Sequence, residues 1–139
     1  MRNILAFISI LFCSFQLSAQ TQKYQLSTHI LDITTGTPSA NVLVMLEKQN
    51  DEGSGWEKLD EKKTDENGRI GTFLLLDENS KDKNTGVYRL TFFTRSYFES
   101  RAVKTFYPFV QVVFEIDGNS HYHVPITLSP YGYSTYRGS

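Results

Sequence analysis

The residues of this chain best suited to acid–base chemistry are its three histidines, His29, His121 and His123. An imidazole has a reference pKa of about 6.5, so it can accept a proton from water near neutral pH. His121 and His123 share a face if their segment is a β-strand, because alternate side chains of a strand point the same way. Two uses follow from this spacing, acid–base catalysis with water or binding of a metal ion.

A metal site is the less favoured of these two interpretations. Two histidines on one strand can share a cation, but a catalytic zinc ion needs a third protein ligand. The sequence offers for that position only His29 or a carboxylate at an unknown distance. We therefore expect no metal ion at His121 and His123.

Arg69 follows a tight turn at residues 65–68, whose Asn67-Gly68 pair readily adopts positive φ angles. An arginine is most often a surface residue without a specific role. The alternative is that the turn directs the guanidinium group toward a planar, anionic ligand, with which it can form paired hydrogen bonds.

The segment 133–139 reads Tyr-Ser-Thr-Tyr-Arg-Gly-Ser and combines phenol, hydroxyl and guanidinium groups. It is too polar for a buried strand, and two tyrosines and an arginine are not typical of a frayed terminus. We expect the segment to be held in place with these groups lining a site. Tyrosines at this density are also typical of a subunit interface, and the two interpretations are compatible.

Short segments rich in β-branched and aromatic residues must position these groups. The predicted strands are 26–34, 41–48, 56–64, 69–73, 87–94, 109–116, 121–128 and 131–136. One short helix is predicted at 95–102, and a turn at 117–120 is predicted to join its two flanking strands as a hairpin. Seven to eight short strands with frequent turns indicate an all-β sandwich with one short helix.

The alternation of apolar residues predicts where the histidines point. Leu26 and Ile30 share one face of the first strand, so His29 points to the opposite face. In the strand 121–128 the even-numbered positions from 122 are apolar, which directs His121 and His123 outward together. All three histidines are thus predicted on outer sheet faces, where a site forms only if something covers them.

The N-terminus has the pattern of a secretory signal peptide at residues 1–19. Arg2 precedes an apolar run from Ile4 to Phe12, and cleavage after Ala19 would remove Cys13, the only cysteine of the chain. We therefore expect an exported protein, periplasmic or secreted, with one domain at residues 20–139. Removing Arg2 from the 14 basic residues leaves 13 against 15 acidic ones, a formal charge of −2 that argues against nucleic-acid and membrane partners.

Four segments together resemble the motifs of the 5-hydroxyisourate hydrolases, the transthyretin-related enzymes of urate breakdown. They are Ser27-Thr28-His29-Ile30-Leu31-Asp32, Gly68-Arg69, the stretch from His121 to Pro130, and the closing Tyr136-Arg137-Gly138-Ser139. The resemblance spans essentially all of residues 20–139 and implies a transthyretin-like, or prealbumin-like, β-sandwich. It also implies a homotetramer, a dimer of dimers, whose channels between dimers hold the sites.

The resemblance implies an activity and a set of site residues. The reaction would be the hydrolytic opening of the 5-hydroxyisourate ring to 2-oxo-4-hydroxy-4-carboxy-5-ureidoimidazoline, which needs water and, we expect, no cofactor. His29, Arg69 and His123 carry over as catalytic residues, and His29, Arg69, Tyr136 and Ser139 as substrate-binding residues. His121 is interpreted as a neighbour of the site, and the residues do not decide which histidine is the base.

Two alternatives without catalysis remain. A transthyretin-type carrier would have the same fold and hold a hydrophobic ligand in an apolar channel, whereas the histidines and Arg69 predict a polar one. A secreted binding module is suggested by Asp32-Ile33-Thr34-Thr35-Gly36-Thr37-Pro38, which is similar to the opening of many adhesin repeats. Fold alone does not settle function, so the choice depends on the site.

Overall fold

The computed structural model describes residues 21–80 and 82–139. The predicted signal peptide at residues 1–19 lies outside the described residues. The described strands are β1 (Tyr24–Asp32), β2 (Thr37–Pro38), β3 (Leu43–Gln49), β4 (Trp56–Lys63), β5 (Arg69–Leu75), β6 (Gly86–Phe92), β7 (Val110–Ile116), β8 (Tyr122–His123), β9 (Ile126–Ser129) and β10 (Gly132–Thr135). One helix is described, α1 (Thr94–Glu99).

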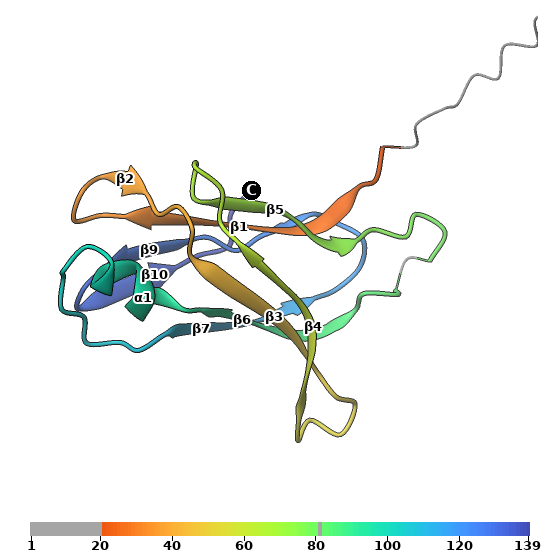
Figure 1. The fold of residues 1–139 in the computed structure, drawn as a ribbon. Helices are drawn as coiled ribbons and strands as arrows, with labels where there is room; N and C mark the ends of the chain where they lie inside the picture. The colour runs from red at the N-terminus through yellow and green to blue at the C-terminus, as the bar shows by residue number, and fades with distance from the viewer. Residues whose placement is uncertain (1–20, 81) are drawn as a thin grey trace, which may run out of the picture.

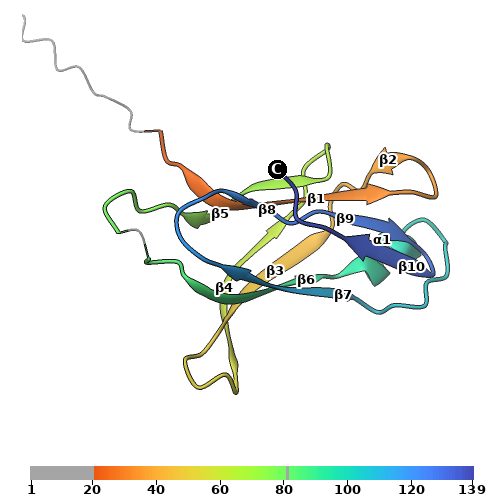
Figure 2. The same ribbon diagram turned by 180° about the vertical axis from the view of Figure 1, so that it is seen from behind.

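The strands form two sheets that face each other, and the predicted all-β sandwich is confirmed (Figures 1 and 2). The first sheet is built around β1, which pairs with β5 and β2 along one edge and with β8 and β9 along the other. β10 extends this sheet beyond β9. The second sheet has the order β4-β3-β6-β7 and is antiparallel throughout.

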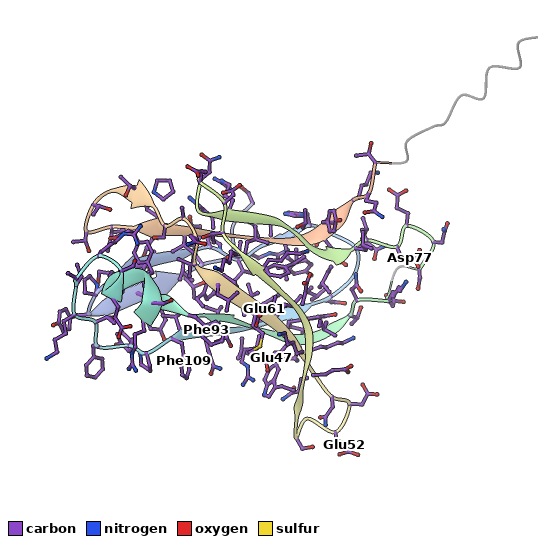
Figure 3. The ribbon with its side chains drawn as sticks, in the orientation of Figure 1. Glu47, Glu52, Glu61, Asp77, Phe93 and Phe109 are labelled. Carbon is purple, nitrogen blue, oxygen red and sulfur yellow. The ribbon has the colours of Figure 1, made fainter. Side chains whose placement is uncertain are left out.

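The core fills the space between the sheets (Figure 3). Its largest fully buried side chains are Tyr88, Phe73, Phe92 and Phe98, which come from both sheets and from α1. Burial of such aromatic side chains is a major source of stability in a domain of this size. The sandwich therefore holds β1 rigidly from its inner face and leaves its outer face free for other uses.

The burial pattern of β1 follows the predicted alternation. Leu26, Thr28 and Ile30 are buried on the inner face, and Ser27 and His29 are half-buried on the outer one. The strand begins and ends two residues earlier than predicted. It ends at Asp32 because that carboxylate accepts a hydrogen bond from the N–H of Thr34 at 2.8 Å and so starts a turn.

The hairpin predicted at residues 117–120 is wrong. β7 pairs with β6, whereas β8 and β9 pair in parallel with β1 in the other sheet. The Tyr122 hydroxyl accepts from the N–H of Asp117 at 2.9 Å and donates to its carbonyl at 2.8 Å, and Gln25 Nε2 donates to Gly118 O at 2.7 Å. These bonds hold the segment as a crossing between the sheets, which a local turn pattern cannot distinguish from a hairpin.

Two further predicted elements differ in extent. The strand predicted at 121–128 is divided into β8 and β9, because Pro125 has no N–H to donate and interrupts the ladder. The helix predicted at 95–102 is α1, which begins at Thr94 and ends at Glu99. In residues 21–80 and 82–139 there is no helix of the length and apolar character that crossing a bilayer would require.

Candidate active site

His29 and Arg69 are brought side by side by the pairing of β1 with β5. The two residues are direct cross-strand partners, so their side chains leave the same face of the sheet. Both lie on the outer face, His29 half-buried and Arg69 exposed. No ion pair within the described part of the chain involves Arg69, so its charge is available to a ligand.

The turn before Arg69 is held against β1 and fixes where β5 begins. Asp65 Oδ1 accepts from the N–H groups of Asn67 and Arg69, at 2.9 and 2.8 Å. Gly68 has the predicted positive φ, +68°, and a Cβ there would lie 2.6 Å from the carbonyl oxygen of Ile30. Only glycine fits so close to a neighbouring backbone, which explains the Asn-Gly sequence before Arg69.

His123 joins this group from the opposite edge of β1. β8 pairs in parallel with β1, and His123 is the partner of Ser27, two residues before His29. Ser27 Oγ lies 2.8 Å from His123 Nδ1 and 2.8 Å from His121 Nε2. The prediction that all three histidines lie on an outer face is confirmed, and that face belongs to a single sheet.

The C-terminal segment is held over His123, as predicted for a segment that is not frayed. The N–H of Gly138 donates to the carbonyl of His123 at 2.8 Å, and the two residues form an isolated β-bridge. Figures 1 and 2 both show the C-terminus above β1 and β5. Ser139 therefore follows directly on a residue fixed to the strand that carries His123.

The pKa values of His29 and His123 lie below the ordinary value of 6.5. Burial lowers the pKa of His29 most, followed by the charge of Arg69, while a backbone hydrogen bond to Asn67 and the Asp65 carboxylate oppose this. Burial also lowers the pKa of His123 most, followed by the charges of Arg69, His29 and His121. Both imidazoles are therefore neutral near pH 7 and able to accept a proton.

Tyr136 lies apart from this group. Its side chain is 60% exposed and lines a groove between β7 and the C-terminal segment, together with Val113 and Glu115. Arg137 lies in the same groove, with its guanidinium carbon 5.0 Å from the centre of the Tyr122 ring. Of the predicted site residues, the structure thus brings together His29, Arg69 and His123, anchors the residue before Ser139 to His123, and leaves Tyr136 at another surface.

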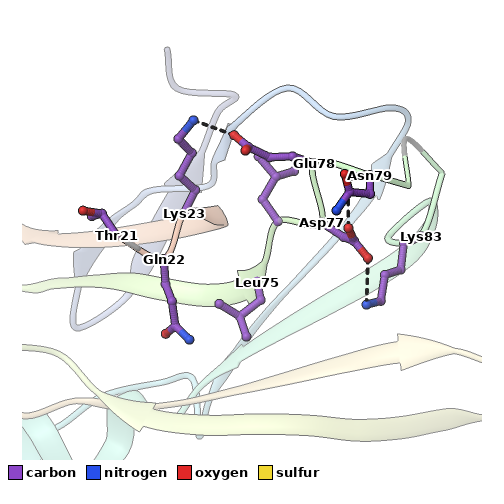
Figure 4. A pocket seen from close by; sticks show the side chains of 9 residues that line it. Thr21, Gln22, Lys23, Leu75, Asp77, Glu78, Asn79 and Lys83 are labelled. Carbon is purple, nitrogen blue, oxygen red and sulfur yellow. Dashed lines mark hydrogen bonds and ion pairs between the residues drawn. The ribbon is translucent and has the colours of Figure 1, made fainter. Parts of the chain in front are cut away.

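A second hollow, at the start of β1, differs in character (Figure 4). Its walls carry the ion pairs of Lys23 with Glu78 and of Lys83 with Asp77, at 2.5 and 3.2 Å. These charges neutralise one another, unlike the guanidinium of Arg69. Across residues 21–80 and 82–139, no group of three or more His, Cys, Asp or Glu side chains is arranged to hold a metal ion.

Ser27 is the site residue that the sequence analysis missed. Its hydroxyl contacts both His121 and His123. The spacing of Ser27 and His29 places them on one face of β1 and could have indicated a shared site. The contact with His123, however, depends on the parallel pairing of β1 with β8, which the predicted hairpin excluded.

Comparison with known proteins places this geometry in a family. The profile of the HIUase/Transthyretin family matches residues 26–138. A 5-hydroxyisourate hydrolase of Salmonella typhimurium is 48% identical over 115 residues, which cover 82% of this chain and 80% of that protein. Two solved structures are also similar, each covering 82% of this chain.

The first of these structures is a 5-hydroxyisourate hydrolase of Klebsiella pneumoniae, with a TM-score of 0.67, 38% identity and 98% of its chain covered. The second is sea bream transthyretin in complex with thyroxine, with a TM-score of 0.72, 31% identity and 94% of its chain covered. An enzyme and a thyroxine-binding protein thus share this fold at comparable similarity.

Proposed function

The chain belongs to the HIUase/Transthyretin family and is a hydrolase of urate degradation, and we propose that it acts on 5-hydroxyisourate at the cluster of His29, Arg69 and His123. One observation carries this assignment of the site. Two neutral imidazoles and a guanidinium that forms no ion pair among the described residues, from three different strands, converge on one outer face. Groups with shifted pKa values that cluster in this way are typical of a functional site rather than of an ordinary solvent-exposed face.

The reaction follows from the chemistry of these three groups. A neutral imidazole of His29 or His123 accepts a proton from water, and the resulting hydroxide adds to a ring carbonyl of the substrate. Arg69 stabilises the negative charge that develops on the carbonyl oxygen. The ring C–N bond then breaks, the nitrogen receives the proton from the imidazolium, and the ureidoimidazoline carboxylate is released.

Ser139 and Tyr136 are proposed to orient the substrate, with unequal structural support. The bridge between Gly138 and His123 supports a role for the next residue, Ser139, whose hydroxyl would form a hydrogen bond with the substrate. Tyr136 lines the groove beside β7 and has no such anchor to the cluster. We therefore rank Ser139 above Tyr136 as a substrate-binding residue.

We also propose a homotetramer, a dimer of dimers, that covers the open face. β7 and β10 are each an edge strand of their sheet and carry exposed apolar side chains, among them Val113 at 58% and Tyr133 at 42% exposure. Edge strands of this kind favour association with another subunit. Export to the periplasm or the exterior is proposed from the signal-peptide pattern of residues 1–19.

The chemistry of the outer face, rather than the fold, distinguishes a hydrolase from a carrier. Sea bream transthyretin was solved with thyroxine, and its fold is as similar to this chain as that of the hydrolase. A carrier for a hydrophobic ligand needs apolar walls. His29, Arg69 and His123 make this face polar and partly charged, which supports hydrolysis.

The test uses substrate made in place, because 5-hydroxyisourate decays spontaneously. Urate oxidase converts urate to 5-hydroxyisourate, residues 20–139 are added, and the ultraviolet absorbance of the substrate is followed. We expect decay well above the spontaneous rate, and a loss of roughly 10²- to 10⁴-fold in the His123→Ala variant. Decay at the spontaneous rate with the folded wild-type protein would contradict the proposal and favour a carrier or binding module.

A further inference from the structure

We propose that Ser27 and His121 form a hydrogen-bond relay that fixes His123 with its proton on Nδ1, so that Nε2 is the atom that accepts the proton from water. The relay runs from the carbonyl of Tyr24 through His121 and Ser27 to His123. It deepens the proposed function and rests on it, because it assigns the base that the three-residue cluster leaves open. His121 and Ser27 are positioning residues and do not touch the substrate.

The direction of each hydrogen bond in the relay follows from its first acceptor, the Tyr24 carbonyl oxygen, which has no hydrogen to donate. The Tyr24 carbonyl oxygen lies 3.1 Å from His121 Nδ1 and can only accept, so His121 Nδ1 carries the proton. In a neutral imidazole the other nitrogen then accepts, so the Ser27 hydroxyl donates to His121 Nε2 at 2.8 Å.

The hydroxyl of Ser27 has a single hydrogen, which fixes its role toward the second histidine. Having donated to His121, Ser27 Oγ can only accept from His123 Nδ1, which lies 2.8 Å away. His123 is therefore protonated on Nδ1 and has its free electron pair on Nε2. The reverse order would place the lone pair of His121 Nδ1 against the Tyr24 carbonyl, which leaves two acceptors facing each other.

The backbone around the relay is fixed by the parallel pairing of β1 with β8. The N–H of Val124 donates to the Ser27 carbonyl at 3.0 Å, and Thr28 Oγ1 donates to the Val124 carbonyl at 2.7 Å. Both bonds join the two strands immediately beside the Ser27–His123 contact. The sheet thus fixes the backbone positions from which the Ser27 hydroxyl and the His123 imidazole meet.

The arrangement suits a base that must gain and lose a proton in each turnover. When His123 accepts a proton on Nε2, its Nδ1–H continues to donate to Ser27, so no partner has to rotate. In the other tautomer Nε2 already carries a proton and cannot accept one. The family of serine hydrolases shows how costly a wrong tautomer of a catalytic histidine is, with a loss of about 10⁴-fold in kcat.

The protonation of each ring nitrogen can be read directly by NMR. Residues 20–139 contain all three histidines, and ¹⁵N-labelled histidine gives distinct shifts for protonated and unprotonated nitrogens. We expect His121 and His123 to carry the proton on Nδ1 in the neutral wild-type protein. In Ser27→Ala, His123 should move toward the Nε2–H form, with kcat reduced roughly 10- to 100-fold and KM little changed.

Three variants separate the relay from a general effect on folding. Ser27→Thr keeps the hydroxyl and should restore both the tautomer and most of kcat. Ser54→Ala removes an exposed hydroxyl in the β3–β4 turn and should change neither. If Ser27→Ala does not fold, His121→Ala tests the same relay. It removes the acceptor that directs the hydrogen of the Ser27 hydroxyl away from His123.

The outcomes for the relay and for the proposed function are distinguishable. An active wild-type enzyme with His123 protonated on Nε2 overturns the relay alone, as does a folded Ser27→Ala variant with unchanged kcat and tautomer. A wild-type protein with the expected tautomers but no hydrolysis overturns the proposed function and leaves the hydrogen-bond assignment supported.

Discussion

The two sheets carry an arginine each on their outer faces, and the two arginines differ in their surroundings. Arg89 on β6 faces Glu47 on β3, with Nε 2.7 Å from Oε2, and its guanidinium carbon lies 4.3 Å from the centre of the Trp56 ring. Glu47 lies on the second sheet in Figure 3. Arg69 on β5 is instead the partner of His29, and no carboxylate pairs with it among the described residues.

This difference distinguishes an arginine that is paired within the fold from one that we propose binds a ligand. The guanidinium of Arg89 is satisfied by Glu47 and Trp56, so it adds to stability and leaves nothing to bind a substrate. The guanidinium of Arg69 lowers the pKa values of His29 and His123, because its positive charge destabilises the protonated imidazoles. The same residue type on the same kind of surface is thus paired in one sheet and, among the described residues, unpaired in the other.

The largest effect is expected from removing each arginine in turn. Arg69→Ala should lower kcat/KM by roughly 10²- to 10³-fold, because the developing negative charge loses its stabilising partner. Its free energy of unfolding should change by less than about 0.5 kcal/mol. Arg89→Ala should retain activity and lose about 1–2 kcal/mol of its free energy of unfolding, because the buried Glu47 is left without a counter-charge. Steady-state kinetics and urea denaturation measure the two quantities on the same samples.

Similar behaviour of Arg69→Ala and Arg89→Ala would contradict the proposed difference between the two arginines. Equal losses of stability would mean that Arg69 also supports the fold, and an active Arg69→Ala variant would remove it from the catalytic site. Arg69→Lys refines the result, because a lysine keeps the charge but cannot form the paired hydrogen bonds of a guanidinium. We expect it to recover only part of the activity.

The outward directions of the proposed catalytic side chains could be predicted because they depend on local alternation. Leu26 and Ile30 are fully buried, and Tyr122 and Val124 nearly so, at 8% and 6% exposure, which turns His29 and His123 outward as the sequence indicated. The Asn67-Gly68 turn before Arg69 could also be predicted, because the preference of Gly68 for a positive φ depends only on the local sequence.

The partners of those side chains could not be predicted, because they depend on which strands pair. A hairpin at 117–120 would have paired β8 with β7, whereas β8 lies against β1. Only the pairing of β8 with β1 brings His123 into contact with Ser27 and into the same group as Arg69. Tyr136 differs from these residues, because motif resemblance predicts it in the site while the structure shows it lining the groove beside β7, so its role stays a prediction.

A smaller effect is expected from Gly138, which separates the terminal Ser139 from Arg137. A Cβ at position 138 would lie 2.4 Å from His123 Cδ2, closer than any tolerated contact. Gly138→Ala should therefore push the C-terminal segment or the imidazole out of place and lower kcat/KM roughly 10-fold. Stability should change little, because the segment contributes few buried side chains.

Gly132→Ala is the matched control for this variant. Its Cβ would meet only Ser129 Oγ at 3.6 Å, which is an ordinary contact, and Gly132 has no positive φ. We expect full activity from Gly132→Ala in the same assay. Full activity from Gly138→Ala would show that the C-terminal anchor is dispensable and would remove Ser139 from the substrate-binding residues.

The smallest effect is a shift of the pH profile, and it tests whether Arg69 and the histidines form one electrostatic unit. A base must be neutral to accept a proton, so kcat/KM should fall as the pH falls through its pKa. Because the pKa values of His29 and His123 lie below 6.5, activity should persist to a lower pH than an unperturbed histidine would allow. Rates measured across the acid range give this limb directly.

Arg69→Gln provides the second half of the pH test. Removing a positive charge favours the protonated imidazoles, so the pKa values of both His29 and His123 should rise. NMR titration of the ring signals measures this even where turnover is too slow to follow. Arg89→Gln, on the opposite sheet, should leave both titrations unchanged. If Arg69→Gln also left them unchanged, the guanidinium would be too distant to act on the same substrate as the imidazoles, and the contrast between the two faces would lose its functional meaning.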